Sequence, residues 1–326
     1  MANILVTGGA GYIGSHMTHA LADRGDRVVV LDNLSTGIRG LVAPEAHFVE
    51  GDIGDSTLVR ALLREHEIEA VVHFAGSVVV PESVEQPLRY YANNTIKSCT
   101  LIDSCVAEGV KRFIFSSTAA VYGMGSGKPV EEEDGKAPIN PYGRSKLMTE
   151  WVLADAAHAH GLRYVVLRYF NVAGADPKGR TGQSTPRATH LIKRACQVAL
   201  QRAPQLDIFG TDFPTRDGTG VRDYIHVSDL IECHLLALEH LRQGGAPKTL
   251  NCGYGRGFSV REVIEEVCRV SGRELPVRLS PRRAGDPAEL IANSERIKSE
   301  LGWRPMHDNL SEIVASAFAW EARQNS

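Results

Sequence analysis

The chain has 326 residues, of which 43% are hydrophobic and 23% charged, as in globular proteins with a sizeable core. Its formal net charge of -3 gives no basic footprint, so we expect no nucleic-acid partner. The sequence has no apolar stretch of roughly 18 residues and no charged leader before an apolar run, so neither a membrane span nor a secretory signal is expected. The six cysteines form no CxxC pair, which predicts reduced thiols in a cytoplasmic protein without a metal site.

The first half of the chain alternates predicted strands and helices. The strand signals are short apolar runs without polar alternation, as expected for parallel strands covered on both faces. An amphipathic helical stripe follows the first strand and ends at Gly25. Six strands with helical crossovers predict an α/β fold with a doubly wound parallel sheet of the Rossmann type. The expected strands are Asn3–Thr7, Arg27–Asp32, His47–Glu50, Ala70–Phe74, Arg112–Ser116 and Arg163–Tyr169.

Beyond about residue 171 the pattern changes to long polar loops between shorter elements. The loops at 174–186 and 209–221 are rich in Gly, Pro and Thr, and loops of this length in compact domains are often functional. We expect one domain at 1–171 and a smaller α+β domain at 172–326, with the helix at 227–241 packing back against the first. The expected elements are helices at 191–203, 226–241 and 260–271 and a strand at 249–252.

A glycine-rich turn, TGGAGYIG at 7–14, follows the first strand and opens the first helix. Glycine permits the tight turn and a close backbone approach, and the helix N-terminus supplies N–H donors to a phosphate. In this context the pattern predicts a dinucleotide site. Its expected contacts in the turn are Gly8, Gly11, Tyr12, Ile13 and Gly14.

A carboxylate at the end of the second strand indicates which dinucleotide binds. Asp32 is placed to accept hydrogen bonds from ribose hydroxyls, and it would repel a 2′-phosphate. No arginine follows it, so NAD is favoured over NADP. We expect further contacts where the other strands end. These are Asn33, Asp52, Ile53, Phe74, Ala75, Gly76, Asn94, Ser116 and Tyr169.

The pentapeptide YGRSK predicts the catalytic pair. Tyr142 and Lys146 lie four residues apart on a helix and therefore share a face. A free phenol has a pKa of about 10, and a nearby ammonium and the positive nicotinamide ring both favour the phenolate. Lowering that pKa to about 7 needs roughly 4 kcal/mol. At the end of the fifth strand, Ser117 or Thr118 can hydrogen-bond the reacting oxygen, and Thr118 is favoured.

Several segments together resemble the UDP-galactose 4-epimerase family of the extended short-chain dehydrogenase/reductase superfamily, over nearly the whole chain. They are TGGAGYIGSH (7–16), LDNLSTG (31–37), FSSTAAVYG (115–123), NPYGRSK (140–146), LRYFNVAGA (167–175), GTDFPTRDGTGVRDYIHVSDL (210–230) and RRAGD (282–286). The resemblance implies an epimerase that interconverts UDP-galactose and UDP-glucose. Tyr142 would take the C4 hydroxyl proton while hydride passes to NAD, and hydride would return to the other face of a 4-keto sugar.

The same resemblance implies particular roles for other residues. Lys146 is similar to the ribose ligand that tunes the tyrosine. Arg222 and Arg283 resemble the diphosphate clamp, Asp286 the ribose contact, and Phe209 part of the uracil pocket. A homodimer through the helices at about 88–108 and 142–160 is also implied. The implied substrate contacts are Thr118, Tyr142, Asn171, His190, Leu191, Phe209, Arg222, Tyr224, Arg283, Asp286 and Leu290.

Departures from the family pattern bear on the alternatives. A lysine common after Phe-Ala-Gly is missing from Ser77–Pro81, and Leu290 lies where the C2 substituent of the sugar is gated. A 4-epimerase acting on UDP-N-acetylhexosamines or UDP-pentoses therefore stays open. A 4,6-dehydratase would carry Asp-Glu where this chain has Ala119 and Ala120, and a UDP-glucuronate decarboxylase would carry a glutamate in that turn. A non-enzymatic NAD sensor would typically lack Tyr142 and Lys146.

Overall fold

The computed structural model describes residues 2–125, 127–185, 188–283 and 285–324. The predicted loop at 174–186 and the RRAGD segment each include a residue outside this description. Among the described residues, no helix is long and apolar enough to cross a membrane. The same ranges contain no group of three or more His, Cys, Asp or Glu side chains that could hold a metal ion.

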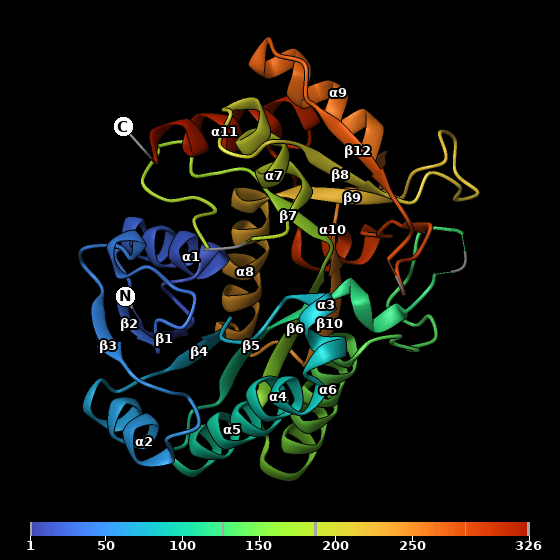
Figure 1. The fold of residues 1–326 in the computed structure, drawn as a ribbon. Helices are drawn as coiled ribbons and strands as arrows, with labels where there is room; N and C mark the ends of the chain where they lie inside the picture. The colour runs from blue at the N-terminus through green and yellow to red at the C-terminus, as the bar shows by residue number, and fades with distance from the viewer. Residues whose placement is uncertain (1, 126, 186–187, 284, 325–326) are drawn as a thin grey trace.

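Seven parallel strands form the central sheet in the order β3-β2-β1-β4-β5-β6-β10 (Figure 1). This doubly wound order confirms the predicted fold class, and the chain reverses its direction of travel between β1 and β4. The seventh strand, β10, comes from the segment that the sequence assigns to the second domain, and it pairs with β6. The strands are β1 (Asn3–Thr7), β2 (Arg27–Asp32), β3 (His47–Glu50), β4 (Ala70–His73), β5 (Arg112–Thr118), β6 (Arg163–Tyr169) and β10 (Lys248–Cys252).

Helices cover both faces of this sheet because alternate strand residues point to opposite sides. Ile4 and Val6 pack in one apolar cluster with α1 (Tyr12–Asp23) and α8 (Val227–Arg242). Leu5 packs on the other side with the second set of helices. Helix α8, in the segment that the sequence places after residue 171, therefore lies against this face of the sheet. The second set comprises α2 (Ser56–Glu65), α5 (Lys97–Ala107) and α6 (Pro141–His160).

Short helical segments connect β4 to α5 and follow β5. A π-helical segment, η2, runs directly into α5, and such segments are frequent at functional sites. A 3₁₀ turn, η3, begins immediately after Thr118. These segments are α3 (Val80–Glu85), α4 (Pro87–Tyr90), η2 (Tyr91–Ile96) and η3 (Ala119–Tyr122), with a further 3₁₀ turn, η1, at Arg39–Leu41.

A smaller unit covers the carboxyl end of the sheet. Its central strand β9 pairs with β7, β11 and β13, while β8 pairs with β12. Three helices, α7, α9 and α11, share one apolar core with β8. The elements are β7 (Asn171–Ala173), α7 (Leu191–Ala199), β8 (Leu206–Phe209), β9 (Val221–His226), β11 (Gly257–Ser259), α9 (Val260–Ser271), β12 (Val277–Ser280), β13 (Glu289–Leu290), α10 (Glu295–Leu301) and α11 (Leu310–Arg323).

Candidate active site

The glycine turn lies where the strand order reverses, between the carboxyl ends of β1 and β4. Gly8 has a φ of +71°, and a Cβ there would lie 2.6 Å from the backbone N of Ala75. A Cβ on Gly14 would lie 2.1 Å from the Gly8 carbonyl oxygen, so this contact also requires glycine. Helix α1 begins after Gly11 without a side-chain cap. Its first N–H groups are therefore free of side-chain acceptors and suit an anion such as a pyrophosphate.

Two predicted contacts in this turn use their side chains elsewhere. The Tyr12 hydroxyl donates to the Gly174 carbonyl at 2.7 Å and so ties α1 to the loop after β7. Ile13 packs against the apolar cluster of the sheet. Their backbone N–H groups therefore remain as the means by which these residues can contact a bound nucleotide.

Asp32 lies at the end of β2 and faces the turn. Its carboxylate accepts hydrogen bonds from the Ala10 N–H at 2.9 Å and from the Leu34 N–H at 2.9 Å. Burial raises the pKa of Asp32, and these two N–H groups oppose that rise. A fixed carboxylate at this strand end is well suited to hold ribose hydroxyls.

The β3 end forms a second polar group. Asp52 accepts from Lys97 Nζ at 2.6 Å and from Asn33 Nδ2 at 3.1 Å. Burial raises the pKa of Asp52, but the hydrogen bonds from Lys97, Gly54 and Asn33 together lower it by more. The net shift of this pKa is therefore downward. Ile53 beside it is buried in the apolar core. The sequence did not predict Lys97, because its partner lies 45 residues away.

Asn94 holds the segment after β4. It accepts from the Ser77 N–H at 2.7 Å and donates to the Ser77 carbonyl at 2.9 Å and to Ser145 Oγ at 3.1 Å. A Cβ on Gly76 would lie 3.1 Å from Asn94 Oδ1 and 3.4 Å from Lys146 Nζ. Gly76 thus leaves space beside Lys146. The centroids of the Phe74 and His234 rings lie 4.9 Å apart.

Tyr142, Thr118 and Lys146 meet where β5 ends and α6 begins. Asn140 caps α6 by accepting from the Gly143 N–H, and Pro141 is its first residue. Tyr142 is hydrogen-bonded to Thr118, and Lys146 Nζ donates to the Ser116 carbonyl at 3.0 Å. The three side chains that the sequence singled out therefore come together.

The electrostatics of this group follow from its burial. Burial lowers the pKa of Lys146 to about 8. Burial raises the pKa of Tyr142, while the hydrogen bond with Thr118 lowers it. Because the fold by itself disfavours the Tyr142 phenolate, a positive charge close to the hydroxyl is needed to make this residue a base at neutral pH.

The other hydroxyls of β5 point to different partners. Ser116 Oγ lies 3.1 Å from His234 Nε2 and also bonds Tyr169. Ser117 Oγ donates to Glu150 Oε1 at 2.5 Å. The structure therefore does not bring Ser117 to Tyr142, because alternate strand residues face opposite sides of the sheet. Of the two hydroxyls predicted for catalysis, Thr118 is the one that is hydrogen-bonded to Tyr142.

The predicted substrate residues gather around β9. Asn171 on β7 is paired with Tyr224, and Leu290 on β13 is paired with Arg222. The register of three strands thus brings together four residues that are far apart in the sequence. Arg222 also contacts Asp286 and donates from Nη1 to the Val221 carbonyl at 2.8 Å. The arginine is oriented before any ligand binds.

The remaining predicted substrate residues line β8 and α7. The Arg283 guanidinium lies 3.7 Å from the centre of the Phe209 ring. Burial lowers the pKa of Arg283, and Asp286 and Asp207 oppose this. His190 is the N-cap residue of α7 and is exposed, with Leu191 following it.

The two halves of the site meet in a small apolar cluster. Leu290 packs with Ala119, Tyr122, Leu147 and Phe170. Three of these lie on or next to the turn after Thr118 and on α6. Leu290 therefore links the β9 group, where it is paired with Arg222, to the apolar side chains beside the end of β5 and on α6.

Two buried groups near the site were missed from the sequence. Asp223 accepts from the backbone N–H groups of Tyr254, Gly255 and Ala292 at 2.9 to 3.2 Å, and burial raises its pKa to about 6. Glu150 pairs with Arg168 on β6. A charged residue among apolar neighbours, as in VRDYIH and VVLRYF, was the available signal.

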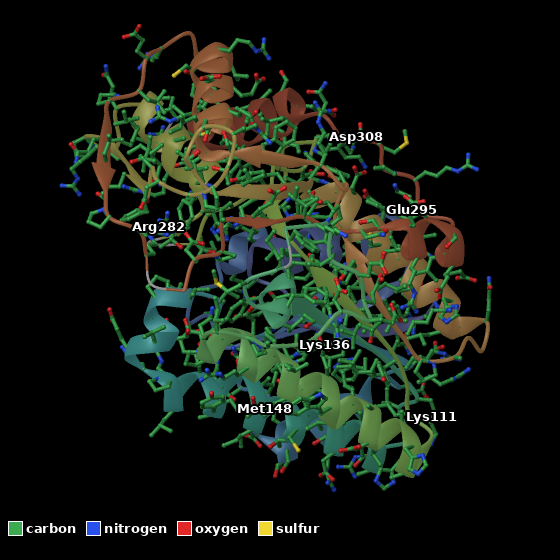
Figure 2. All side chains as sticks on the ribbon, turned by 90° about the vertical axis from the view of Figure 1, so that its right-hand side faces the viewer. Lys111, Lys136, Met148, Arg282, Glu295 and Asp308 are labelled. Atoms are coloured by element: carbon green, nitrogen blue, oxygen red, sulfur yellow. The ribbon has the colours of Figure 1, made fainter. Side chains whose placement is uncertain are left out.

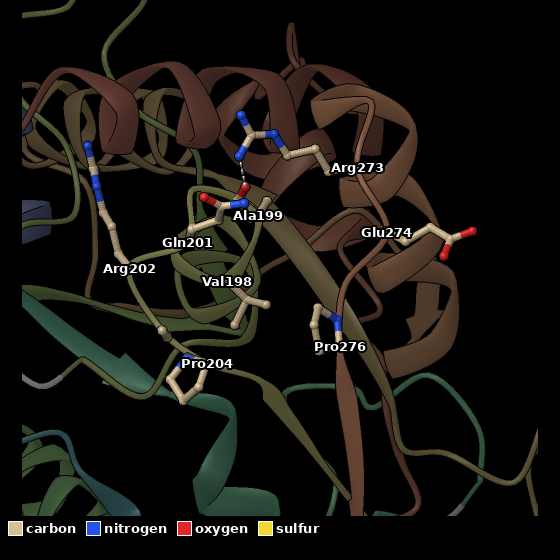
Figure 3. Close-up of a pocket in the computed structure, with 9 residues that line it drawn as sticks. Val198, Ala199, Gln201, Arg202, Pro204, Arg273, Glu274 and Pro276 are labelled. Atoms are coloured by element: carbon tan, nitrogen blue, oxygen red, sulfur yellow. Dashed lines mark hydrogen bonds between the residues drawn. The ribbon is translucent and has the colours of Figure 1, made fainter.

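A surface hollow lies elsewhere on the smaller unit and contains none of the predicted residues. It lies between the end of α7 and the start of β12, where Arg273 Nη1 donates to the Ala199 carbonyl at 2.9 Å (Figure 3). It is lined by Val198, Ala199, Gln201, Arg202, Ala203, Pro204, Arg273, Glu274 and Pro276.

A glycine turn at the switch point, a carboxylate fixed at the end of β2 and a buried Tyr–Lys pair are the features of a dinucleotide-dependent enzyme of the Rossmann class. The chain belongs to the NAD dependent epimerase/dehydratase family, whose model matches residues 4–253. A UDP-glucose 4-epimerase from Azospirillum brasilense is 58% identical over 98% of this chain and 91% of its own length.

Solved structures agree with this assignment. UDP-glucose 4-epimerase from Brucella ovis, in complex with NAD, is 45% identical with a TM-score of 0.95, over 98% of this chain and 99% of its own. The enzyme from Stenotrophomonas maltophila, with bound NAD and formylated UDP-arabinopyranose, is 40% identical with a TM-score of 0.95, over 99% and 98%. The predicted family, fold class and NAD cofactor are confirmed.

Proposed function

We propose that this chain catalyses the reversible, NAD-dependent epimerisation of a UDP-hexose at C4, interconverting UDP-galactose and UDP-glucose. The observation that carries the proposal is the meeting of Thr118, Tyr142 and Lys146 at the switch-point edge, joined through Leu290 to the β9 residues. The names of its relatives support the same reaction.

The cofactor residues fit NAD. Gly8, Gly11 and Gly14 leave the turn open to a pyrophosphate, and Asp32 faces the ribose position. Asp52, held by Lys97, lies where the adenine would be bound. Held by these residues, NAD would supply the hydride acceptor and donor for the inversion at C4 of the sugar. A missing lysine after Gly76 removes one expected contact, and Asn94 holds that segment instead.

Tyr142 moves the C4 proton. Its hydroxyl is buried against Thr118, which provides a hydrogen-bonded path between the sugar oxygen and the phenol. Lys146, held by the Ser116 carbonyl, supplies the nearby positive charge that favours the phenolate. Because burial alone raises the Tyr142 pKa, the base forms only where that charge and the cofactor are both in place.

The β9 residues and their neighbours hold the UDP portion. Arg222 and Arg283 present guanidinium forks suited to phosphate oxygens, and Asp286 accepts from the uridine ribose. Phe209 and Leu191 would line the uracil pocket, and His190, next to Leu191 in the chain, would also contact the substrate. Asn171 and Tyr224 contact the sugar or its phosphate.

Leu290 bears on substrate choice. It is 9% exposed and lies at the junction of the two halves of the site. Its intermediate size keeps activity on UDP-N-acetylhexosamines or UDP-pentoses as the alternative. A 4,6-dehydratase is not supported, since methyl groups of Ala119 and Ala120 follow Thr118, and Glu150 nearby is held by Arg168 and Ser117.

We also propose that the enzyme is a cytoplasmic homodimer. Large apolar side chains are exposed on the outer helices: Leu88 is 81% exposed, Ile96 64% and Trp151 58%. Met148 on α6, labelled in Figure 2, is 36% exposed. Exposed apolar residues gathered on neighbouring helices are typical of an interface. All six cysteines are free, which supports a reducing compartment.

The test is conversion of UDP-galactose by the purified protein without added NAD, followed by anion-exchange chromatography. Wild-type protein should approach one fixed mixture from either sugar. Tyr142→Phe should lower kcat by about a thousandfold while keeping bound NAD, because only the acid–base hydroxyl is lost. Tyr164→Phe, a tyrosine of β6 outside the site, is the control.

The proposal fails if NAD-loaded, folded protein converts none of the UDP-hexoses, UDP-N-acetylhexosamines or UDP-pentoses. Turnover confined to the last two groups would keep the mechanism and change the substrate.

A further inference from the structure

One stripe of α6 bonds three consecutive residues of β5. Tyr142, Lys146 and Glu150 are four residues apart and therefore share one side of the helix. Tyr142 bonds Thr118, Lys146 bonds the Ser116 carbonyl, and Glu150 bonds Ser117 Oγ. Two of these bonds belong to the proposed chemistry, and the third is left without a role.

That third bond leads into a buried ion pair. Arg168 donates from Nε to Glu150 Oε1 at 3.0 Å and from Nη2 to Oε2 at 2.6 Å. The side chains of Glu150 and Arg168 are only 7% and 5% exposed. Ser117 donates to the same carboxylate at 2.5 Å. The carboxylate is thus neutralised and fixed on both oxygens.

Arg168 also reaches the far side of Thr118. Its Nη1 donates to the Tyr122 hydroxyl at 3.0 Å and to the Glu132 carbonyl at 3.1 Å. The Tyr122 hydroxyl in turn donates to Asn251 Oδ1 on β10 at 2.7 Å. Thr118 therefore lies in the chain between Ser117 and Tyr122. Both of these residues are hydrogen-bonded to the Glu150–Arg168 ion pair.

A network of this kind is suited to fixing geometry. A buried ion pair contributes little net stability compared with well-packed apolar side chains, because both charges lose their hydration. It does impose one arrangement on the elements it joins, here α6, β5, β6 and the turn after Thr118. Those elements carry Tyr142, Lys146 and Thr118.

We propose that Ser117, Glu150 and Arg168 are positioning residues. They fix the position of α6 relative to β5, and this position sets the distance between Tyr142 and Thr118. This proposal rests on the proposed function of the site. Ser117 itself touches none of the reacting groups and acts through Glu150.

The test uses Ser117→Ala in the NAD-loaded enzyme, which removes one rung and leaves the Glu150–Arg168 pair intact. Ser104→Ala is the matched control, since Ser104 is also fully buried and bonds only the Thr100 carbonyl within α5. Three quantities are measured: kcat and KM with UDP-galactose, and the pKa of Tyr142. That pKa comes from tyrosinate absorbance, assigned by difference from the same variant carrying Tyr142→Phe.

Ser117→Ala should lower kcat about tenfold with KM changed less than about twofold, because a small displacement of a catalytic group is costly to the rate. It should also raise the pKa of Tyr142, while Ser104→Ala changes neither. If Ser117→Ala does not fold, Tyr122→Phe loosens the other side of Thr118 and should give the same pair of effects.

The proposal is overturned if Ser117→Ala has a lower melting temperature yet keeps the wild-type kcat and the wild-type pKa of Tyr142. The titration needs no sugar, so it separates this proposal from the function itself. A wild type inactive on UDP-hexoses, UDP-N-acetylhexosamines and UDP-pentoses would refute the proposed function, and the shift in the Tyr142 pKa would still decide the positioning role.

Discussion

Lys146 provides a prediction whose sign and size follow from its burial. The residue is 3% exposed, and its ammonium bonds the Ser116 carbonyl and lies 4.9 Å from the centre of the Phe115 ring. These contacts do not offset the lost hydration, since the pKa of Lys146 falls from 10.5 to about 8. Removing the charge should therefore stabilise the nucleotide-free protein.

The magnitude comes from the two pKa values. The fall from 10.5 to about 8, at about 1.4 kcal/mol for each pH unit, corresponds to about 3 kcal/mol of cost below pH 8. Above pH 8 the native protein releases this proton while the unfolded chain keeps it. The unfolded state then binds more protons, so the unfolding free energy of the wild type must rise with pH.

The assay is urea unfolding of the nucleotide-free wild type and of Lys146→Met at about pH 7 and about pH 9.5. Methionine keeps the length of the side chain and does not titrate. At neutral pH the variant should be more stable, by up to about 3 kcal/mol less the lost hydrogen bond. The difference should narrow by about 2 kcal/mol at the higher pH. A difference that stays constant, or that widens, would refute the claim that burial depresses this pKa.

Three further outcomes are expected. Glu150→Ala should lower the unfolding free energy by about 3–5 kcal/mol, because it leaves the buried Arg168 cation unpaired. Adding Arg168→Met should recover most of this loss. Urea unfolding midpoints test the prediction, and a double variant in which the two losses of stability simply add would contradict it. Arg222→Met should raise KM for UDP-galactose at least about tenfold with little change in kcat, since a charge-assisted phosphate contact is lost. Steady-state kinetics and calorimetry of UDP binding measure this effect. An unchanged affinity would mean that Arg222 serves only to hold Asp286. Trp151→Glu should convert the proposed dimer to a monomer, because it places a charge in an apolar interface. Light scattering measures the molar mass, and a wild type that is already monomeric would contradict the proposed interface.

Local patterns predicted the elements near the cofactor because their causes lie within a few residues. Short apolar runs fixed the first six strands to within two residues at each end. The turn around Gly8 needs a positive φ, which only glycine adopts cheaply, so its position was readable directly. The pairing of Tyr142 with Lys146 follows from helical spacing alone.

Other features could not be read from local pattern. The strand at 248–252 has the same kind of local sequence pattern as the elements next to it in the chain. It nevertheless joins the seven-stranded sheet beside β6 and not the smaller unit. Ser117 and Thr118 are adjacent hydroxyls, and only the strand's alternation decided which of them faces Tyr142. The partners of Asp52 and Glu150 lie 45 and 18 residues away.

The sequence by itself determined the class of fold, the dinucleotide turn and the Tyr–Lys pair, because each depends on the backbone preferences and spacing of neighbouring residues. Only the tertiary structure decided which groups are buried, which hydroxyl lies beside Tyr142 and how the residues of β9 meet the end of β5. Those outcomes depend on burial and on contacts between strands far apart in the chain. Burial and long-range register are properties of the packed molecule, and no stretch of sequence contains them.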